Sequence, residues 1–245
     1  MTTDPTVMVV IPWRPTQDRQ YAYDLTVARY RALLPDAMIL AVDTDHEPFC
    51  LAGCRNKGVR LAEDAGFDVV VLGDADTLPE QDPLLEAIRS AATSGLVHLP
   101  YTSYRSLRRD GTAQHWAGVP LEDCNYFEVP GACSGVYVTT PATWWAHGAQ
   151  DELFLGWGGE DAAWAAAHLT LLGAEPVRHE GRVYSLHHAS AVKEGEQYSA
   201  NFARIYRYHQ AQGNPDATWA LIREGEAGHG ERAVGQLHTQ PEAAL

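Results

Sequence analysis

The segment from Val69 to Pro79, which reads V-V-V-L-G-D-A-D-T-L-P, constrains the fold of this chain most. Its first four residues are apolar and mostly β-branched, which is typical of a strand buried on both faces of a parallel sheet. Gly73 ends this run, and Asp74 and Asp76 follow. Side chains two residues apart in an extended chain point the same way, so the two carboxylates repel each other unless a cation lies between them. Taken alone, the segment fits a cation site and a solvated turn equally well.

Strand and helix patterns alternate along the first part of the chain. Buried-strand patterns cover Val7–Pro12 and Met38–Val42 as well as Val69–Leu72, and helical patterns lie between them at 23–34 and 51–65. This alternation predicts an α/β fold with a mainly parallel, Rossmann-like sheet and helices on both faces. A G-x-G-x-x-G sequence does not follow the first strand, so a dinucleotide cofactor is not supported.

The rest of the chain continues this pattern, with one exception at 102–130. Helices are expected at 83–93, 162–172 and 201–212, and strands at 97–101, 134–139 and 183–186. The segment 102–130 is rich in turn residues, and we expect a long irregular stretch that is either a binding loop or lid or, given the cluster of Arg105, Arg108 and Arg109, a surface loop with a basic tip. We predict a single domain over 1–223, with a nucleotide-binding half at about 7–100 and an acceptor or catalytic half at about 101–223. A mobile tail is expected over 224–245.

The composition argues against several classes of protein. The 245 residues are 45% hydrophobic, which is enough for a packed core. The net charge of -14 argues against extended binding to nucleic acid, but it leaves room for a small anionic ligand held by a few arginines. We find neither a signal peptide nor a stretch near the ~20 apolar residues of a membrane span, so we expect a reduced, cytoplasmic protein. The Cys50-x-x-x-Cys54 spacing is then structural or incidental.

A second acidic motif, Gly156-Trp157-Gly158-Gly159-Glu160-Asp161, leads into the helix expected at 162–172. Carboxylates in a first helical turn interact favourably with the helix dipole, so capping alone explains Glu160 and Asp161. Capping does not explain Trp157 or the glycines, which permit tight turns and close approach of a ligand. The face of Trp157 can stack on a sugar ring while the carboxylates bind its hydroxyls; burial of Trp157 in the core is the alternative.

Taken in chain order, these motifs resemble those of GT-A fold glycosyltransferases. V-L-G-D-A-D is followed by the small-residue segment Gly131-Ala132-Cys133-Ser134-Gly135, then by F-L-G-W-G-G-E-D and a late pair of histidines. The chain is most similar to glycosyltransferase family 2 and to families with a W-G-G-E-D segment. These include the beta-1,4-galactosyltransferases and the polypeptide N-acetylgalactosaminyltransferases. The resemblance covers roughly residues 7–190 and implies a GT-A fold and a nucleotide-sugar donor.

The resemblance also implies a metal site. Asp74-Ala75-Asp76 matches the D-x-D motif, in which the second acid, here Asp76, binds Mn²⁺ and the first, Asp74, contacts the metal or the ribose. Ser185-Leu186-His187-His188 is similar to an H-L-W-H segment whose last histidine is a metal ligand. This favours His188 and leaves His187 as the alternative. Mixed carboxylate and imidazole ligands suit Mn²⁺ better than Mg²⁺, which stays possible.

Further matches imply a nucleotide site. Ile11-Pro12-Trp13-Arg14 resembles a first-strand segment that lines the nucleotide pocket, Asp43 matches an acid that reads uracil, and Arg55-Asn56-Lys57-Gly58 resembles an R-N-x-G segment. For Arg55 and Lys57 the residues alone favour a solvated helix face, and their order in the chain favours the site. The expected nucleotide contacts are Pro12, Trp13, Arg14, Asp43, Arg55, Asn56, Asp74 and Ala75.

The function implied is metal-dependent, inverting transfer of a sugar from a UDP-sugar to an acceptor hydroxyl. Asp161 matches the general base, and Trp157, Gly159 and Glu160 match sugar-binding positions. Two alternatives stay open. One is a GT-A-like nucleotidyltransferase that makes a nucleotide-sugar, although Trp13-Arg14-Pro15 is not the Gly-rich basic loop such an enzyme needs. The other is an inactive module that binds nucleotide-sugars. The sequence does not indicate the acceptor.

Overall fold

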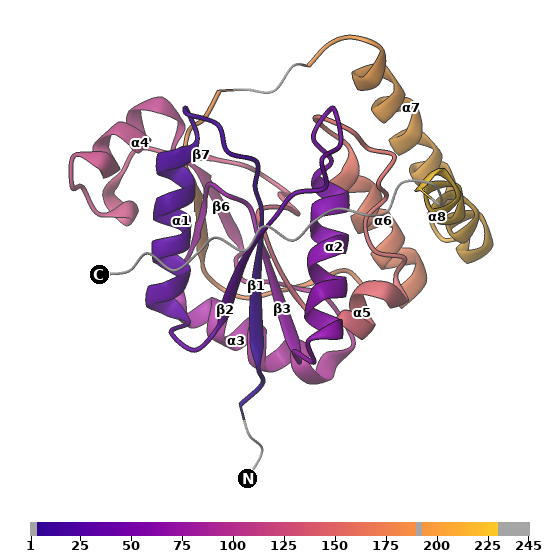
Figure 1. Cartoon of the computed structure of the whole chain (residues 1–245), viewed down its shortest axis with the longest axis horizontal. Coiled ribbons are helices and arrows are strands. Elements are labelled where there is room, and N and C mark those ends of the chain that lie inside the picture. The colour runs from indigo at the N-terminus through magenta and orange to yellow at the C-terminus, as the bar shows by residue number, and fades with distance from the viewer. Residues whose placement is uncertain (1–3, 190–192, 230–245) are drawn as a thin grey trace.

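The buried strands of the N-terminal half form the centre of a six-stranded sheet (Figure 1). The computed structural model describes residues 4–189 and 193–229 and gives the strand order β2-β1-β3-β8-β5-β9. β1 (Val7–Pro12) pairs in parallel with β2 (Met38–Val42) and with β3 (Val69–Gly73). β8 (Val136–Thr139) is antiparallel to both β3 and β5 (His98–Leu99), and β9 (Val177–Arg178) is parallel to β5. Every strand of this sheet except β8 therefore runs the same way, which confirms the mainly parallel sheet.

Helices cover both faces of this sheet. α1 (Gln20–Leu33) and α2 (Leu51–Asp64) lie on opposite sides of β1 to β3 in Figure 1. α2 approaches β1 so closely that a Cβ on Gly58 would lie 2.2 Å from Cγ1 of Val10. The Cys50 Sγ accepts a hydrogen bond from Gly53 N at the start of α2, and all four cysteines are free. The other helices near the sheet are α3 (Gln81–Ser94), α5 (Pro141–Ala146) and α6 (Glu160–Leu172).

The segment 102–130 is less irregular than expected, because it contributes two strands to a second, smaller sheet. This sheet has the order β4-β10-β6-β7. Its strands are β4 (Thr77–Pro79), β10 (Arg182–Ser185), β6 (Ser103–Ser106) and β7 (Phe127–Glu128). Between β6 and β7 the chain forms α4 (Arg108–Trp116) and a 3-10 turn at Leu121–Asp123. The prediction of an irregular loop is wrong here because each of these elements is too short for a periodic pattern to stand out.

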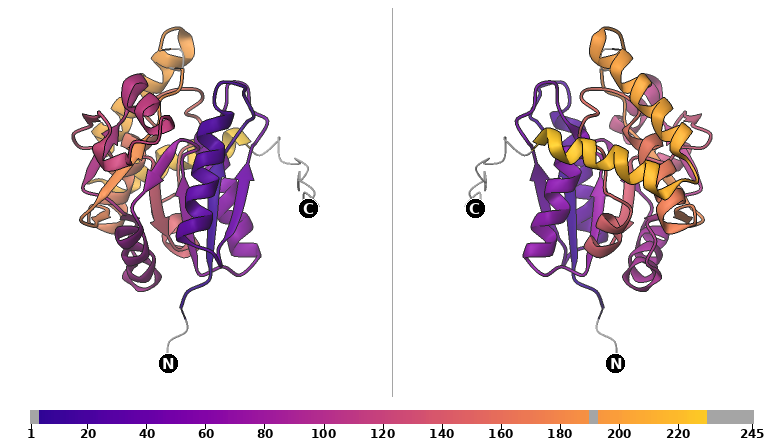
Figure 2. Two further views of the ribbon diagram at one scale, coloured as in Figure 1. Left: turned by 90° about the vertical axis from the view of Figure 1, so that its left-hand side faces the viewer. Right: turned by 90° about the vertical axis from the view of Figure 1, so that its right-hand side faces the viewer.

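Two helices close the described part of the chain. α7 (Glu196–Ala211) begins earlier than expected, and α8 (Pro215–His229) was not predicted. Figure 2 shows both helices on one side of the molecule. They pack on α6 through a cluster that includes Phe154, Ala163, Tyr208 and Leu221. α8 continues to His229, past the expected start of the tail at 224, and residues 230–245 lie outside the described ranges. Within those ranges, no helix has the length and apolar character that a membrane crossing requires.

Candidate functional site

The D-A-D segment lies at the carboxyl end of β3, where two distant segments are joined to it. The Asp74 N donates to Gly135 O at 2.8 Å, which fixes the small-residue segment that precedes β8. The Leu186 N donates to Asp76 O at 2.8 Å, so the histidine pair that follows β10 also reaches this edge. The fold therefore brings together three of the motifs that the sequence spreads over nearly half of the chain.

Asp76 faces His188 rather than His187. The Nε2 of His188 lies 3.3 Å from Oδ2 of Asp76, whose carboxylate is almost fully buried. The hydrogen bond to Asp76 raises the pKa of His188, against the opposite effect of burial. His187 is exposed, and its backbone N donates to Oγ1 of Thr112 in α4 at 2.8 Å. α4 thus holds the segment in the position from which His188 reaches the aspartate.

Arg55 joins the two acidic motifs. It extends from α2 and its side chain is completely buried, in contrast to the solvated helix face that its residues alone suggested. Its Nη2 lies 2.6 Å from Oδ1 of Asp74, and its Nη1 lies 3.2 Å from Oδ1 of Asp161. The same Nη1 donates to Oε1 of Gln150 at 2.9 Å. A single guanidinium therefore fixes Asp74 relative to Asp161.

Asp161 is held from one side only. Its Oδ1 accepts hydrogen bonds from Arg55 and from the hydroxyl of Tyr137, a fully buried residue of β8. Its Oδ2 accepts no hydrogen bond from the described residues, and about a quarter of the side chain is exposed. Gly159, with a φ of 101°, adopts the left-handed conformation just before α6 and so sets the direction of this acidic turn. One oxygen of Asp161 is thus positioned while the other stays available.

Glu160 differs from its neighbour because it is buried. Burial, followed by the charge of Asp161, raises the pKa of Glu160 to about 8, so this carboxyl group is mostly neutral at pH 7. Burial also raises the pKa of Asp74, together with the charges of Asp76 and Asp161, while Arg55 opposes the rise. Glu160 can therefore donate a hydrogen bond, which an ionised carboxylate cannot do.

The charge of the cluster fits a divalent cation. Asp74 and Asp161 pair with the guanidinium of Arg55, and Asp76 pairs with His188, so the cluster contains three aspartates and one arginine. Asp76 and His188 supply one carboxylate and one imidazole, a donor set that suits Mn²⁺. Across residues 4–189 and 193–229, no three His, Cys, Asp or Glu side chains are grouped to hold a metal, so the remaining ligands would come from substrate and water.

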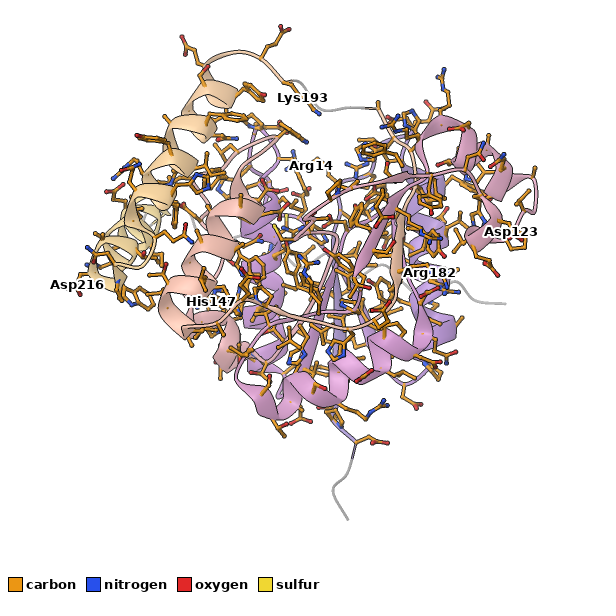
Figure 3. The ribbon with its side chains drawn as sticks, turned by 180° about the vertical axis from the view of Figure 1, so that it is seen from behind. Arg14, Asp123, His147, Arg182, Lys193 and Asp216 are labelled. Carbon is orange, nitrogen blue, oxygen red and sulfur yellow. The ribbon has the colours of Figure 1, made fainter. Side chains whose placement is uncertain are left out.

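Trp157 lies at the surface, so the alternative of burial in the core is wrong. It is 41% exposed, and its ring stacks on Tyr198 of α7 with centroids 6.0 Å apart. The Nζ of Lys193 lies 4.0 Å from the centre of the indole. Figure 3 shows Lys193 and Arg14 at the same end of the molecule. The partly exposed indole of Trp157 therefore lies against Tyr198 and Lys193, a few residues before the acidic turn.

The expected nucleotide residues fall into two groups. Arg14 forms a bidentate pair with Asp43 at 2.7 and 2.8 Å where β1 and β2 end, and Trp13 stacks on Tyr23 with centroids 4.4 Å apart. Pro12 ends β1, and Ala75 is buried between the two aspartates. Asn56 differs from these residues because both the nitrogen and the oxygen of its side-chain amide are hydrogen-bonded to protein groups. It donates to Gln150 O and Glu152 Oε1 and accepts from Trp144 Nε1 and Gln150 N.

Two residues of the site were missed from sequence. Tyr137 lies in the strand pattern V-Y-V-T, where all four residues are buried, and Gln150 lies in the irregular segment between α5 and α6. Neither position carries a local signal, because each acts through Arg55 and Asp161, which are far away in the sequence. Only the folded arrangement identifies them.

Similarity to known proteins is found at the level of structure. No family model matches the sequence, and no curated protein sequence matches it. The catalytic domain of Drosophila beta-1,4-galactosyltransferase 7, solved with xylobiose, aligns with a TM-score of 0.56 and 16% identity over 81% of this chain and 79% of that one. GalNAc-T7, solved with UDP, GalNAc and Mn²⁺, aligns with a TM-score of 0.53 and 10% identity over 93% of this chain. The alignment spans 57% of the GalNAc-T7 chain. The chain therefore has the GT-A fold of these glycosyltransferases, as the order of its motifs predicts.

Proposed function

We propose that the chain is a metal-dependent, inverting glycosyltransferase that moves a sugar from a UDP-sugar to an acceptor hydroxyl. The observation that carries the proposal is the bridge from Asp74 through Arg55 to Asp161. Asp74 belongs to the motif expected at the donor, and Asp161 to the motif expected at the acceptor. A rigid buried connection between them is what transfer between two substrates needs, because the reacting atoms must be aligned.

Asp76 and His188 are the proposed ligands of Mn²⁺, with Mg²⁺ as the alternative. Their separation and the surplus of negative charge around Arg55 support this assignment. When bound there, a divalent cation neutralises the charge that develops on the leaving diphosphate. The choice of UDP as the nucleotide is supported by the structure of GalNAc-T7, which contains UDP and Mn²⁺. Arg14 and Asp43, with Pro12 and Trp13, are the proposed contacts for the uridine.

Asp161 is the proposed general base. Arg55 and Tyr137 hold Oδ1, which leaves Oδ2 to accept the proton of the acceptor hydroxyl. The hydroxyl oxygen forms its bond to the anomeric carbon as the bond from that carbon to the diphosphate breaks, and the electron pair leaves with the diphosphate. Attack from the face opposite the leaving group inverts the configuration. Neutral Glu160 can donate a hydrogen bond to a sugar hydroxyl, and Trp157 can stack on the ring beside Gly159.

Turnover of UDP-sugars tests this proposal. The protein is incubated with a panel of UDP-sugars and Mn²⁺, first alone and then with pooled hydroxyl acceptors, and release of UDP is measured. A transferase releases UDP slowly alone and faster with a suitable acceptor. Turnover that requires pyrophosphate would instead identify a nucleotidyltransferase, and binding of UDP-sugar without any turnover would identify a binding module. Asp161→Asn provides the matched control, since it should bind the donor without transferring the sugar.

A further inference from the structure

Arg19 is a cation beside the candidate site that lacks a partner. It lies just before α1, its Nε is buried, and this atom makes no hydrogen bond. Within the described ranges, the guanidinium also forms no ion pair with a carboxylate, although the chain carries 32 acidic residues. Buried donors are almost always satisfied, so a donor without a partner points to a group that joins the protein later.

Packing places Arg19 next to Asp76 and His188. Ala22, one turn further along α1 and on the same face, belongs to a buried cluster with Leu78 and Leu186. Leu78 follows Asp76 by two residues, and Leu186 precedes His188 by two. The guanidinium of Arg19 is also close enough to His188 for the two groups to interact electrostatically. Arg19 therefore lies on the side of the Asp76–His188 pair that faces α1.

Helix stability does not explain an arginine at this position. Arg19 is the N-cap of α1, but its side chain makes no capping hydrogen bond. N-caps favour Ser, Thr, Asp and Asn, and the positive end of the helix dipole disfavours a cation. The first turn of α1 also contains no acidic residue that would offset the charge. The position is thus unfavourable for the free protein, and it becomes favourable when an anion is bound.

We propose that Arg19 binds the diphosphate of the nucleotide, an inference that rests on the proposed function. Each phosphate of a sugar-linked diphosphate is negatively charged, and the acidic cluster is itself negative even after Arg55 is counted. The two positive charges of one divalent cation do not neutralise the diphosphate and the acidic cluster together. The planar guanidinium of Arg19 offers donors that match phosphate oxygens. Because the leaving diphosphate gains charge as the sugar departs, Arg19 binds the departing group more strongly than the intact donor.

Nucleotide binding to Arg19→Asn tests this inference. Affinities for UDP with Mn²⁺ are measured by calorimetry, and affinities for uridine, which lacks phosphate, are measured by NMR titration. We expect the Kd for UDP to rise about 10- to 100-fold, as for loss of a charge-assisted hydrogen bond, and the Kd for uridine to stay within about twofold. The melting temperature should stay the same or rise, because Asn is a better N-cap than Arg.

Arg31→Asn is the matched control, since Arg31 is exposed in the last turn of the same helix and loses the same charge. It should leave both affinities unchanged. The inference is overturned if Arg19→Asn binds UDP within twofold of the unaltered protein, or if UDP and uridine lose affinity equally. Failure of the unaltered protein to bind UDP with Mn²⁺ would overturn the proposed function together with the inference. Normal UDP binding by both proteins would overturn the inference alone.

Discussion

Arg55 and Asp74 form a 2.6 Å ion pair in which the guanidinium is fully buried and the carboxylate is partly exposed. The pair connects the middle of the protein to the edge of the site, because α2 supplies Arg55 and the end of β3 supplies Asp74. The guanidinium also lies 4.9 Å from the ring centre of Tyr137 in β8. The packing of the core and the geometry of the candidate site therefore depend on the same side chain.

Replacing Arg55 by Met should destabilise the protein strongly. The substitution leaves Asp74 and Asp161 without their buried counter-charge, and removing one partner of such a pair costs about 3–5 kcal/mol. Unfolding in urea measures this loss. Arg60→Met is the control, because Arg60 is exposed on the same helix and lies over Trp145, a contact worth about 0.5–1 kcal/mol. Similar losses for the two variants would contradict the bridging role of Arg55.

The metal assignment distinguishes the two adjacent histidines. Asp76→Ala and His188→Ala should each weaken Mn²⁺ binding in the presence of UDP by about 10-fold or more, as expected when a ligand is lost. His187→Ala is the control and should stay within about twofold, because His187 is exposed and only its backbone is held by Thr112. Binding is measured by calorimetry, and EDTA should abolish turnover. Full turnover after metal is removed, or a larger effect at His187, would show the assignment to be wrong.

Buried histidines outside the candidate site should make the protein sensitive to acid. Burial lowers the pKa of His147 to about 3 and that of His98 to about 4. In the unfolded chain the pKa of each histidine is about 6.5. Between about pH 6.5 and 4 the unfolded state therefore binds more protons than the folded state. Stability is therefore fully present above about pH 6.5 and falls as the pH decreases, by up to about 1.4 kcal/mol per pH unit for each histidine.

Urea unfolding at several pH values between 7.5 and about 4.5 measures this dependence. His147→Phe should remove the contribution of one proton and so flatten the pH profile. His209→Gln, which changes an exposed histidine in the last turn of α7, should leave the profile unchanged. A free energy of unfolding that is constant across this pH range would contradict the lowered pKa values of His147 and His98.

Most of the central fold could be predicted from sequence, because long apolar strands and periodic helices carry strong local patterns. Val69–Gly73 is buried at every residue, as its β-branched composition predicts. The short elements between β6 and β7 could not be predicted, since Gly118 and Pro120 follow a helix of only nine residues. The α4 helix matters nonetheless, because Thr112 fixes the segment that carries His188.

Residues of the candidate site could be predicted from sequence only where they belong to a short motif that is recognisable by itself. Asp76 and Asp161 stand in short acidic motifs with flanking glycines, and the structure brings these motifs to one edge of the sheet. The connections between motifs carry no such pattern. Arg55 was expected to contact nucleotide, yet it lies between two carboxylates, and the amide of Asn56 is used entirely by protein groups. Long-range partners of this kind are set by tertiary packing.

Asp161→Asn tests the central claim most directly. Asn keeps the shape of the side chain and can still accept hydrogen bonds from Arg55 and Tyr137, but it cannot take a proton from the acceptor. Transfer should fall by about 10²–10⁴-fold, the usual contribution of a general base, while the Kd for UDP stays within a few-fold. Asp82→Asn is the control for a purely capping role. It removes an acid from the first turn of α3 and should cost about 0.3–1 kcal/mol of stability without affecting transfer.

The decisive measurement is the rate of sugar transfer by Asp161→Asn relative to the unaltered protein, at saturating UDP-sugar and Mn²⁺. The account predicts a loss of at least about 100-fold with donor binding retained. Transfer within about tenfold of normal, accompanied only by a lower melting temperature like that of Asp82→Asn, would show that Asp161 caps α6 and that another group accepts the proton.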